Sequence, residues 1–240
     1  MERIPEKVLK AYEASESYQK LKKIRNDNSK ILQGYYRKYK DSLSYFKKEA
    51  AKKLDHERYG TGMALPRGRL CPGNIEELII GNIKRGRLVK KYVNPGYVYG
   101  YDKEDNLITS DMVEGEIRDR EYIFWEEPQI QLGLKYWGVD LELAEITEAA
   151  YDEQGKIQRY LFGLMDGEKV EEIHIETYRY EGNKAFVTYI YSILIDGDYI
   201  TGEHVVLDMD EQGKVLKYTG YTDMYPEEVY EGVPKHKLVL

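Results

Sequence analysis

Residues 166–197 have the sequence DGEKVEEIHIETYRYEGNKAFVTYIYSILIDG, and this stretch decides the fold. Asp-Gly pairs stand at both of its ends, and Glu181-Gly-Asn183 divides it in the middle. Glycine accepts the positive φ that tight hairpin turns require, so these positions predict turns. The residues between them either alternate in polarity or are continuously apolar, which is typical of strands. The stretch therefore predicts two antiparallel strands in consecutive hairpins.

The same turn signals recur along the chain at a regular interval. They are 14 or 15 residues apart and begin at Asp152, Asp166, Glu181, Asp196 and Asp210. No proline lies between Pro128 and Pro226, so every residue there keeps the N–H that a strand ladder needs. The spacing predicts an antiparallel meander of about six strands over 150–222. Further strands from Tyr97 onward bring the expected sheet to about eight or nine.

Alternation along the strands predicts the two faces of this sheet, because successive side chains point to opposite sides. Ile173 and Ile175 share one side of their strand, and Val205 and Leu207 share one side of theirs. We assign these apolar sides to a core surface beneath the N-terminal helices. The intervening side chains predict an acidic, tyrosine-rich, solvent-facing surface that binds a partner through His174, Glu176, Tyr178, His204 and Asp208.

The first 59 residues form a basic helical region. Pro5 suits a first helical turn, and apolar residues recur at intervals of three or four from Tyr18 to Leu54. The run at 26–29 and Gly34 leave open whether this is one helix or two. Residues 60–96 are a Gly/Pro-punctuated connector with a short helix, which Asn74 caps and which runs from Ile75 to about Ile83.

The acidic meander occupies residues 97–240. The sequence therefore predicts an α+β fold in which N-terminal helices pack on a largely antiparallel meander. We expect the segments 1–59, 60–96 and 97–240 to form one compact unit.

The sign of the net charge changes at the same boundary, between residues 96 and 97. Residues 1–96 carry 23 Lys/Arg against 11 Asp/Glu, and residues 97–240 carry 13 against 32. The two parts have formal charges of +12 and −19, which give the net charge of −7. An excess of one sign attracts an oppositely charged partner. The acidic part therefore predicts a basic partner.

The basic part supports an alternative hypothesis, in which the protein binds nucleic acid or another anionic surface. The candidate residues lie on the N-terminal helix and after the short helix, and are Lys22, Lys23, Arg25, Lys84, Arg85 and Arg87. We expect no nucleic-acid binding tighter than non-specific binding, because the acidic part repels the same polyanion.

Nothing in the sequence indicates catalysis, a cofactor or a metal. The motif Gly-x-Ser-x-Gly is absent, and neighbouring pairs such as Glu171-Glu172 point to opposite sides of a strand. His174 and His204 are the one plausible pair of metal ligands, but a zinc site needs two more ligands close by. We expect neither an enzyme nor a bound metal or cofactor.

The expected location is the cytoplasm. Cys71 is the single cysteine, so no intrachain disulfide can form, and a reducing compartment is the simplest interpretation. The first residues have no apolar run of the kind found in a signal peptide, and no stretch has the roughly 18 apolar residues of a membrane span.

Three segments share one turn template: Tyr101-Asp-x-x-Asp-x-Leu107, Tyr151-Asp-x-x-Gly-x-Ile157 and Met209-Asp-x-x-Gly-x-Val215. The template resembles the Tyr-Asp repeat of bacterial Rhs-type shell proteins, in which such units form successive hairpins. Asp105 and Met209 depart from that pattern, and the units here are 50 and 58 residues apart. We interpret the likeness as shared turn chemistry. Asp bonds the backbone two residues on, and Gly or Asp takes the left-handed position.

The chain as a whole resembles the immunity proteins of bacterial polymorphic-toxin systems, which are acidic, cysteine-poor and without catalytic motifs. The resemblance is one of type and rests on no shared motif. It implies a protein that binds a cognate, nuclease-like toxin domain and blocks its active site. A homodimer, in which the acidic face of one copy meets the basic helices of another, is left open.

Overall fold

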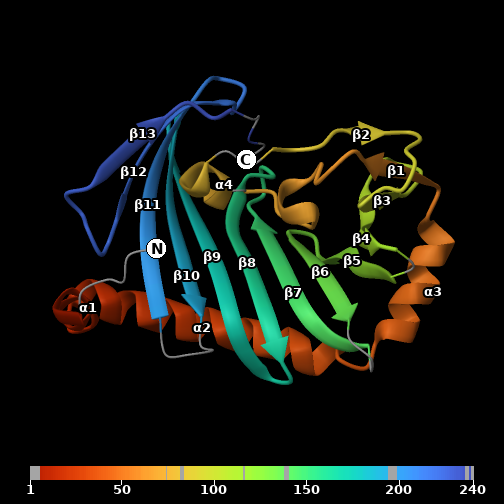
Figure 1. Cartoon of the computed structure of the whole chain (residues 1–240), viewed down its shortest axis with the longest axis horizontal. Coiled ribbons are helices and arrows are strands. Elements are labelled where there is room, and N and C mark those ends of the chain that lie inside the picture. The colour runs from red at the N-terminus through yellow and green to blue at the C-terminus, as the bar shows by residue number, and fades with distance from the viewer. Residues whose placement is uncertain are drawn as a thin grey trace.

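The computed structural model describes residues 6–73, 75–81, 84–115, 117–137, 141–193, 199–235 and 238. Within them, thirteen antiparallel strands form one sheet in the order β13-β12-β11-β10-β9-β8-β7-β6-β5-β4-β3-β1-β2 (Figure 1). The strands are β1 (His56–Gly60), β2 (Leu88–Val89), β3 (Tyr97–Tyr101), β4 (Leu107–Glu114), β5 (Ile117–Glu127), β6 (Ile130–Trp137), β7 (Glu142–Tyr151), β8 (Ile157–Asp166), β9 (Lys169–Glu181), β10 (Lys184–Ile193), β11 (Tyr199–Met209), β12 (Val215–Thr222) and β13 (Val229–Gly232).

The helices are α1 (Glu6–Glu13), α2 (Glu16–Tyr39), α3 (Leu43–Lys53), the short α4 (Ile75–Ile80) and a 3₁₀ turn, η1 (Pro66–Gly68). The predicted α+β class and the meander are confirmed. The sheet has more strands than the expected eight or nine. The residues from Tyr97 onward alone form eleven, β3–β13, and β1 and β2 come from segments for which no strand was expected. The predicted cap residue Asn74 lies outside the described residues.

The N-terminal helices are interrupted between Glu13 and Glu16 and between Tyr39 and Leu43, two places that the sequence pattern did not indicate. The hydroxyl of Ser15 accepts the backbone N–H of Tyr18 at 3.1 Å and so caps α2. The possible break at 26–29 does not occur, because the Asn28 amide donates to the carbonyl of Ile24 (2.8 Å) within a continuous helix.

The shared turn template forms the same structure three times. One carboxylate oxygen of Asp102, Asp152 and Asp210 accepts backbone N–H groups two and four residues on, at 2.8–3.0 Å. The left-handed position is taken by Asp105 (φ 65°), Gly155 and Gly213 (both φ 77°). The predicted turn chemistry is confirmed.

The predicted hairpin at Asp166-Gly167 is also confirmed. Asp166 pairs with Lys169, which leaves Gly167 at φ 55° as the first residue of a two-residue turn, and Gly182 at φ 56° begins the next turn. The segment 184–193 is a strand that pairs antiparallel with both of its neighbours. The predicted turn at Asp196-Gly197 lies outside the described residues.

One side of the sheet, here called the helix face, packs against α1, α2 and α3. The helix α2 runs beneath strands β7–β11 (Figure 1) and contacts each of them. Leu32 is fully buried at the centre of this core, and Phe46 extends the core from α3. The sheet contributes mainly aliphatic side chains, among them Ile146, Ile173 and Ile175. The expected cover by the N-terminal helices is present for Ile173 and Ile175. The assignment of Val205 and Leu207 to the same surface is wrong, because the strand registers turn both to the opposite face, where they belong to a second core.

The opposite side, the connector face, is also covered. The described residues between β1 and β2 (61–73, 75–81 and 84–87), to which the name connector applies from here on, cross it with η1 and α4 (Figure 1). Cys71, Ile75 and Leu78 of the connector pack in a second core with sheet residues that include Ile157 and Tyr160. The sheet is therefore the middle layer of three, and a large part of both faces is removed from solvent.

Leu32→Ala should destabilise the protein by about 2–5 kcal/mol, because it leaves a cavity between α2 and the sheet. Leu32 is 0% exposed, and a Cβ added at Gly163 would overlap its side chain. The matched control is Leu216→Ala on β12, where the side chain is 49% exposed and the expected change is within about 0.5 kcal/mol. Urea unfolding followed by circular dichroism measures both variants. Equal effects would show that α2 does not cover the sheet as described.

Candidate functional site

The strand registers divide the five predicted partner-binding residues between two faces. Tyr178 pairs with Val187, and Val187 pairs with Val205, so Tyr178 shares a face with Val205. His174, Glu176 and Tyr178 therefore lie on the connector face, whereas His204 and Asp208 lie on the helix face. The prediction of one common face is wrong. Both faces of β9–β11 carry apolar residues, so alternation within each strand did not fix which faces coincide.

The predicted exposure of the first three residues is also wrong. His174, Glu176 and Tyr178 are 3%, 2% and 5% exposed. The connector passes directly over them. A Cβ at Gly73 would overlap both the Tyr178 hydroxyl and the Glu176 carboxylate, so only glycine allows the backbone so close. These residues hold the connector in place and do not form an open docking surface.

Buried carboxylates accept hydrogen bonds from backbone N–H groups of the connector. Glu176 accepts the N–H of Ile75 at the start of α4 (3.3 Å) and the hydroxyl of Tyr178. Glu121 on β5 accepts the N–H of Leu70 (2.9 Å) and the hydroxyl of Thr147 (2.8 Å). Burial raises the pKa of both Glu121 and Glu176 to about 7.

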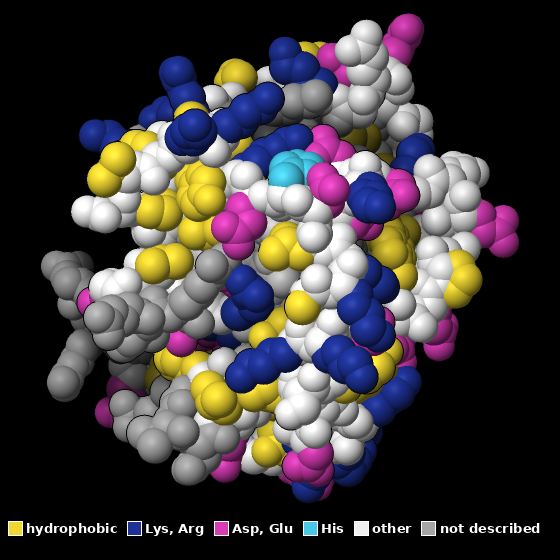
Figure 2. All heavy atoms as spheres, turned by 90° about the vertical axis from the view of Figure 1, so that its right-hand side faces the viewer, with side chains coloured by type: hydrophobic (Ala, Val, Ile, Leu, Met, Phe, Trp, Pro, Cys, Tyr) yellow, Lys and Arg dark blue, Asp and Glu magenta, His cyan; other side chains and the backbone are white. Residues whose placement is uncertain are grey.

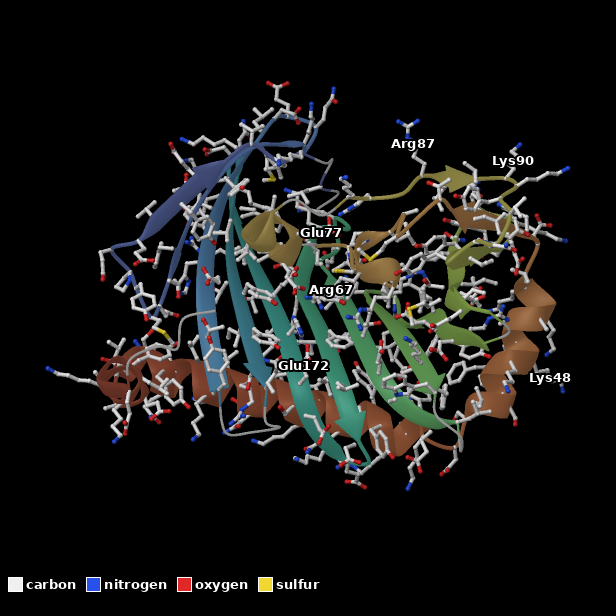
Figure 3. The ribbon with its side chains drawn as sticks, viewed as in Figure 1. Lys48, Arg67, Glu77, Arg87, Lys90 and Glu172 are labelled. Atoms are coloured by element: carbon white, nitrogen blue, oxygen red, sulfur yellow. The ribbon has the colours of Figure 1, made fainter. Side chains whose placement is uncertain are left out.

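A recess of about 520 Å³ opens between α4 and strands β9–β11 on the connector face. Its lining combines carboxylates, tyrosines and a few apolar side chains. These residues are Met63, Arg67, Glu76, Glu77, Ile79, Glu172, His174, Tyr189, Tyr191, Thr201 and Glu203. Figure 3 shows Arg67, Glu77 and Glu172 in the middle of this face, in front of the strands.

His174 lies at the base of the recess and is bonded through both ring nitrogens. Nε2 lies 2.5 Å from Glu172, and Nδ1 lies 2.7 Å from the Tyr189 hydroxyl and 3.2 Å from Nη2 of Arg67. Burial lowers the pKa of His174 to about 4, against the opposing effect of Glu172. The ring is therefore neutral at pH 7. We infer that it carries its proton on Nε2, which donates to Glu172, while Nδ1 accepts from Tyr189 and Arg67.

The carboxylates of the recess differ in their partners. Glu76 pairs with Arg67, and Glu77 pairs with Arg85 (2.6 Å). The hydrogen bond from neutral His174 holds the pKa of Glu172 below its ordinary value, whereas burial raises the pKa of Glu203. Among the described residues, no group of three His, Cys, Asp or Glu side chains is arranged to hold a metal ion. The arrangement is suited to binding a cationic group.

The two candidate metal ligands point away from each other. His174 lies on the connector face, and His204 lies on the helix face, where it stacks on Tyr221 (5.0 Å) and bonds Asp223 (2.9 Å). They cannot share a metal ion through the sheet.

The structure does not gather the predicted basic patch. Arg25 is buried, and Arg85 is half-buried against Glu77, so neither is presented to an anion. Lys23 is exposed on α2, while Lys84 and Arg87 are exposed in the segment between α4 and β2. Lys22 is half-buried on α2. Lys and Arg side chains also gather over α3 and the β1–β2 edge, but Asp and Glu lie among them (Figure 2).

Sequence reasoning missed most of the recess. Glu172 was considered only as a neighbour of Glu171, and Arg67 only as part of a connector. One signal was present, since Arg67-Gly68-Arg69 places two cations in a segment rich in Gly and Pro. The backbone of Arg67 is left-handed (φ 51°), which aims its side chain in a direction that no local pattern predicts.

Comparison of the chain with protein-family models, with curated proteins and with solved structures finds no match. None of the helices in the described part of the chain has the length and apolar character needed to cross a membrane.

Glu176→Gln should remove part of the pH dependence of stability. The native pKa of Glu176 is about 7 against an ordinary 4.5, so the native state holds this proton in a range where the unfolded state loses it. Stability should therefore fall as pH rises from 4.5 to 7. The variant cannot ionise, so it should match the wild type near pH 4.5 and exceed it by about 1–3 kcal/mol at pH 8.

Urea unfolding across pH 4.5–8 measures this difference, with Glu211→Gln in an exposed turn as the control. Glu121 keeps its own raised pKa, so the slope should be reduced and not abolished. A variant that is less stable than the wild type at pH 8 would contradict the assignment, because it would show that the ionised carboxylate stabilises the connector.

Proposed function

We propose that this protein is a cytoplasmic protein-binding module, and within that class an immunity-type inhibitor that binds a basic, nuclease-like toxin domain. The observation that carries the proposal is the recess on the connector face, where Glu172 and Glu203 line a solvent-open cavity between tyrosines. Carboxylates beside aromatic rings suit a basic protein surface, because the rings supply contact area and the charges supply rate and selectivity.

The charge of the chain supports the same partner. Residues 97–240 have 32 Asp/Glu against 13 Lys/Arg, and the recess lies among strands of this part. A negative region speeds the approach of a positive partner by long-range attraction, which salt weakens. Because Glu176 and Tyr178 are buried, the docking surface that we propose is the mouth of the recess. His204 and Asp208, on the other face, are not part of it.

The nucleic-acid alternative has less support. Two of its six residues are not presented to an anion, because Arg25 is buried and Arg85 pairs with Glu77. The remaining exposed charges lie on separate elements, Lys23 on α2 and Lys84 and Arg87 in the segment between α4 and β2. Figure 3 shows Arg87 and Lys90 pointing outward beside β2, well apart from Lys48 on α3.

The purified protein should bind and inhibit the toxin domain encoded beside its own gene. We expect affinity at least about 100-fold tighter than for lysozyme, an unrelated basic protein that controls for non-specific attraction. Association should slow as salt rises from 50 to 500 mM, because screening weakens the steering charge. Surface plasmon resonance and a nuclease assay measure the two effects. Absence of both binding and inhibition would remove the proposed function.

Binding to a 20-base-pair DNA duplex or RNA should be weak at physiological salt. The expected dissociation constant is in the non-specific range of about 10⁻⁴–10⁻⁶ M. Lys84→Glu with Arg87→Glu should change it by less than about tenfold, since only a few phosphate contacts are available there. Fluorescence anisotropy measures the affinity. Binding tighter than 10⁻⁷ M that this double variant abolishes would favour the nucleic-acid alternative.

A further inference from the structure

We propose that the recess is a binding site for a single organic cation, a guanidinium or ammonium group on an apolar stem. In a protein partner, this group is the side chain of one arginine or lysine that acts as the anchor of the complex. The inference deepens the proposed function and rests on it for the source of the cation. The cation site itself can be tested without the partner.

The first argument is the charge of the lining. Arg67 with Glu76 and Arg85 with Glu77 form two ion pairs. Within the described residues, Glu172 and Glu203 form no ion pair with a lysine or arginine. His174, which bonds Glu172, remains uncharged at neutral pH because burial lowers its pKa to about 4. Arg67 and Arg69 also act on Glu172 through their charges, but the lining has four carboxylates against one arginine, so the recess keeps a negative excess.

The second argument is the position of Tyr191. Its strand partners are His174 on β9 and Thr201 on β11, all on the connector face. Glu172 is two residues before His174, and Glu203 is two residues after Thr201, so both carboxylates are diagonal neighbours of Tyr191. Such neighbours lie about 7–8 Å away on the sheet surface. A cation placed over the ring would lie between the strand positions of the two carboxylates and would gain a cation–π contact. The Glu203 carboxylate also accepts the Tyr230 hydroxyl (3.4 Å), which leaves its charge in place.

The third argument is the shape and chemistry of the remaining wall. Met63 and Ile79 line the side formed by the connector and α4. Apolar side chains there suit the methylene stem of a basic side chain, which packs on apolar surface while its charged end stays polar. The volume of about 520 Å³ is within the usual range of ligand pockets, about 300–1,000 Å³.

The chain itself contains an example of this recognition. The guanidinium of Arg67 enters from the connector, lies 3.2 Å from Nδ1 of His174 and pairs with Glu76. A neutral histidine and a carboxylate thus already bind one guanidinium at the base of the recess. The second cation would occupy the part lined by Glu172, Tyr191 and Glu203.

The first experiment uses small probes with the full-length protein. Isothermal titration calorimetry should show binding of L-argininamide and of n-butylammonium in the millimolar range expected for ligands of this size. L-citrullinamide, which keeps the α-ammonium group but has an uncharged ureido side chain of almost the same shape, should bind at least about tenfold more weakly, since a lost charge contact changes the equilibrium by about that factor. Comparison of the two cations shows whether guanidinium or ammonium is preferred. Equal binding of L-citrullinamide and L-argininamide would overturn the inference.

Variants then locate the site. Glu172→Gln and Glu203→Gln should each weaken L-argininamide binding about tenfold, because each removes a charge while keeping the size and hydrogen-bonding capacity of the side chain. The matched control is Glu171→Gln, the adjacent residue on β9, which does not line the recess and should have no effect. Tyr191→Phe should retain binding and Tyr191→Ala should lose it, since the ring and not the hydroxyl makes the contact. Circular dichroism melting confirms that each variant is folded.

The outcomes separate this inference from the proposed function. If the toxin domain binds but Glu172→Gln and Glu203→Gln leave both toxin and L-argininamide affinity unchanged, the anchor site is wrong and the proposed function stands. If L-argininamide binds with the predicted variant pattern but the toxin domain does not, the cation site is supported and the proposed function fails. Competition between L-argininamide and the toxin domain supports both.

Discussion

The layer that the connector forms on the sheet depends on buried carboxylates, which accept hydrogen bonds from the connector backbone. Glu121 on β5 accepts the N–H of Leu70, and Glu176 on β9 accepts the N–H of Ile75. Two strands that are not neighbours in the sheet thus fix the two ends of the segment 70–75. A buried backbone N–H without a partner costs about 1–3 kcal/mol, so the segment is stable on the sheet only where such acceptors exist. The recess follows from this constraint, because the fixed connector supplies its roof. Arg67 and α4 reach His174 and Glu172 only because the connector is held there.

The parts of the fold that were predicted correctly have short-range causes. The turn at Asp152 depends on one carboxylate, two backbone N–H groups and a glycine, all within five residues. The hairpin at Gly167 depends on a positive φ at a single residue. Since such causes are complete within the local sequence, the meander could be predicted from the residues alone. The correct number of strands could not. The sheet has strands such as β6 and β13 away from the recurring turn signals, and β2 is two residues long with no pattern of its own.

The candidate site was not predicted, because its causes are long-range. Glu176 and Tyr178 have the composition of an exposed sheet face, but whether such a face is exposed depends on what covers it. The cover comes from residues about 100 positions earlier, through Gly73 and Ile75. Alternation was a weak guide to the faces for a related reason. When both faces are cores, a polar residue such as His174 marks a buried hydrogen-bond network and not solvent.

The charge asymmetry of the sequence has a different meaning in the folded protein. Several acids of the strand region are interior groups with specific partners, such as Asp111 with Arg120 and Glu148 with Arg159. The arginine beside each of these carboxylates offsets its charge, so they add little to the field that a partner meets. The part of the acidic excess that can act on a partner is the part left without a counter-charge at an accessible position. Glu172 comes close to this condition, because the imidazole beside it is too buried to become charged at neutral pH and Arg67 and Arg69 act on it without forming an ion pair among the described residues. A neutral histidine thus orients the carboxylate without cancelling its charge, which is the physical reason that this recess, and not the acidic strand region as a whole, is the place to expect selective recognition of a cation.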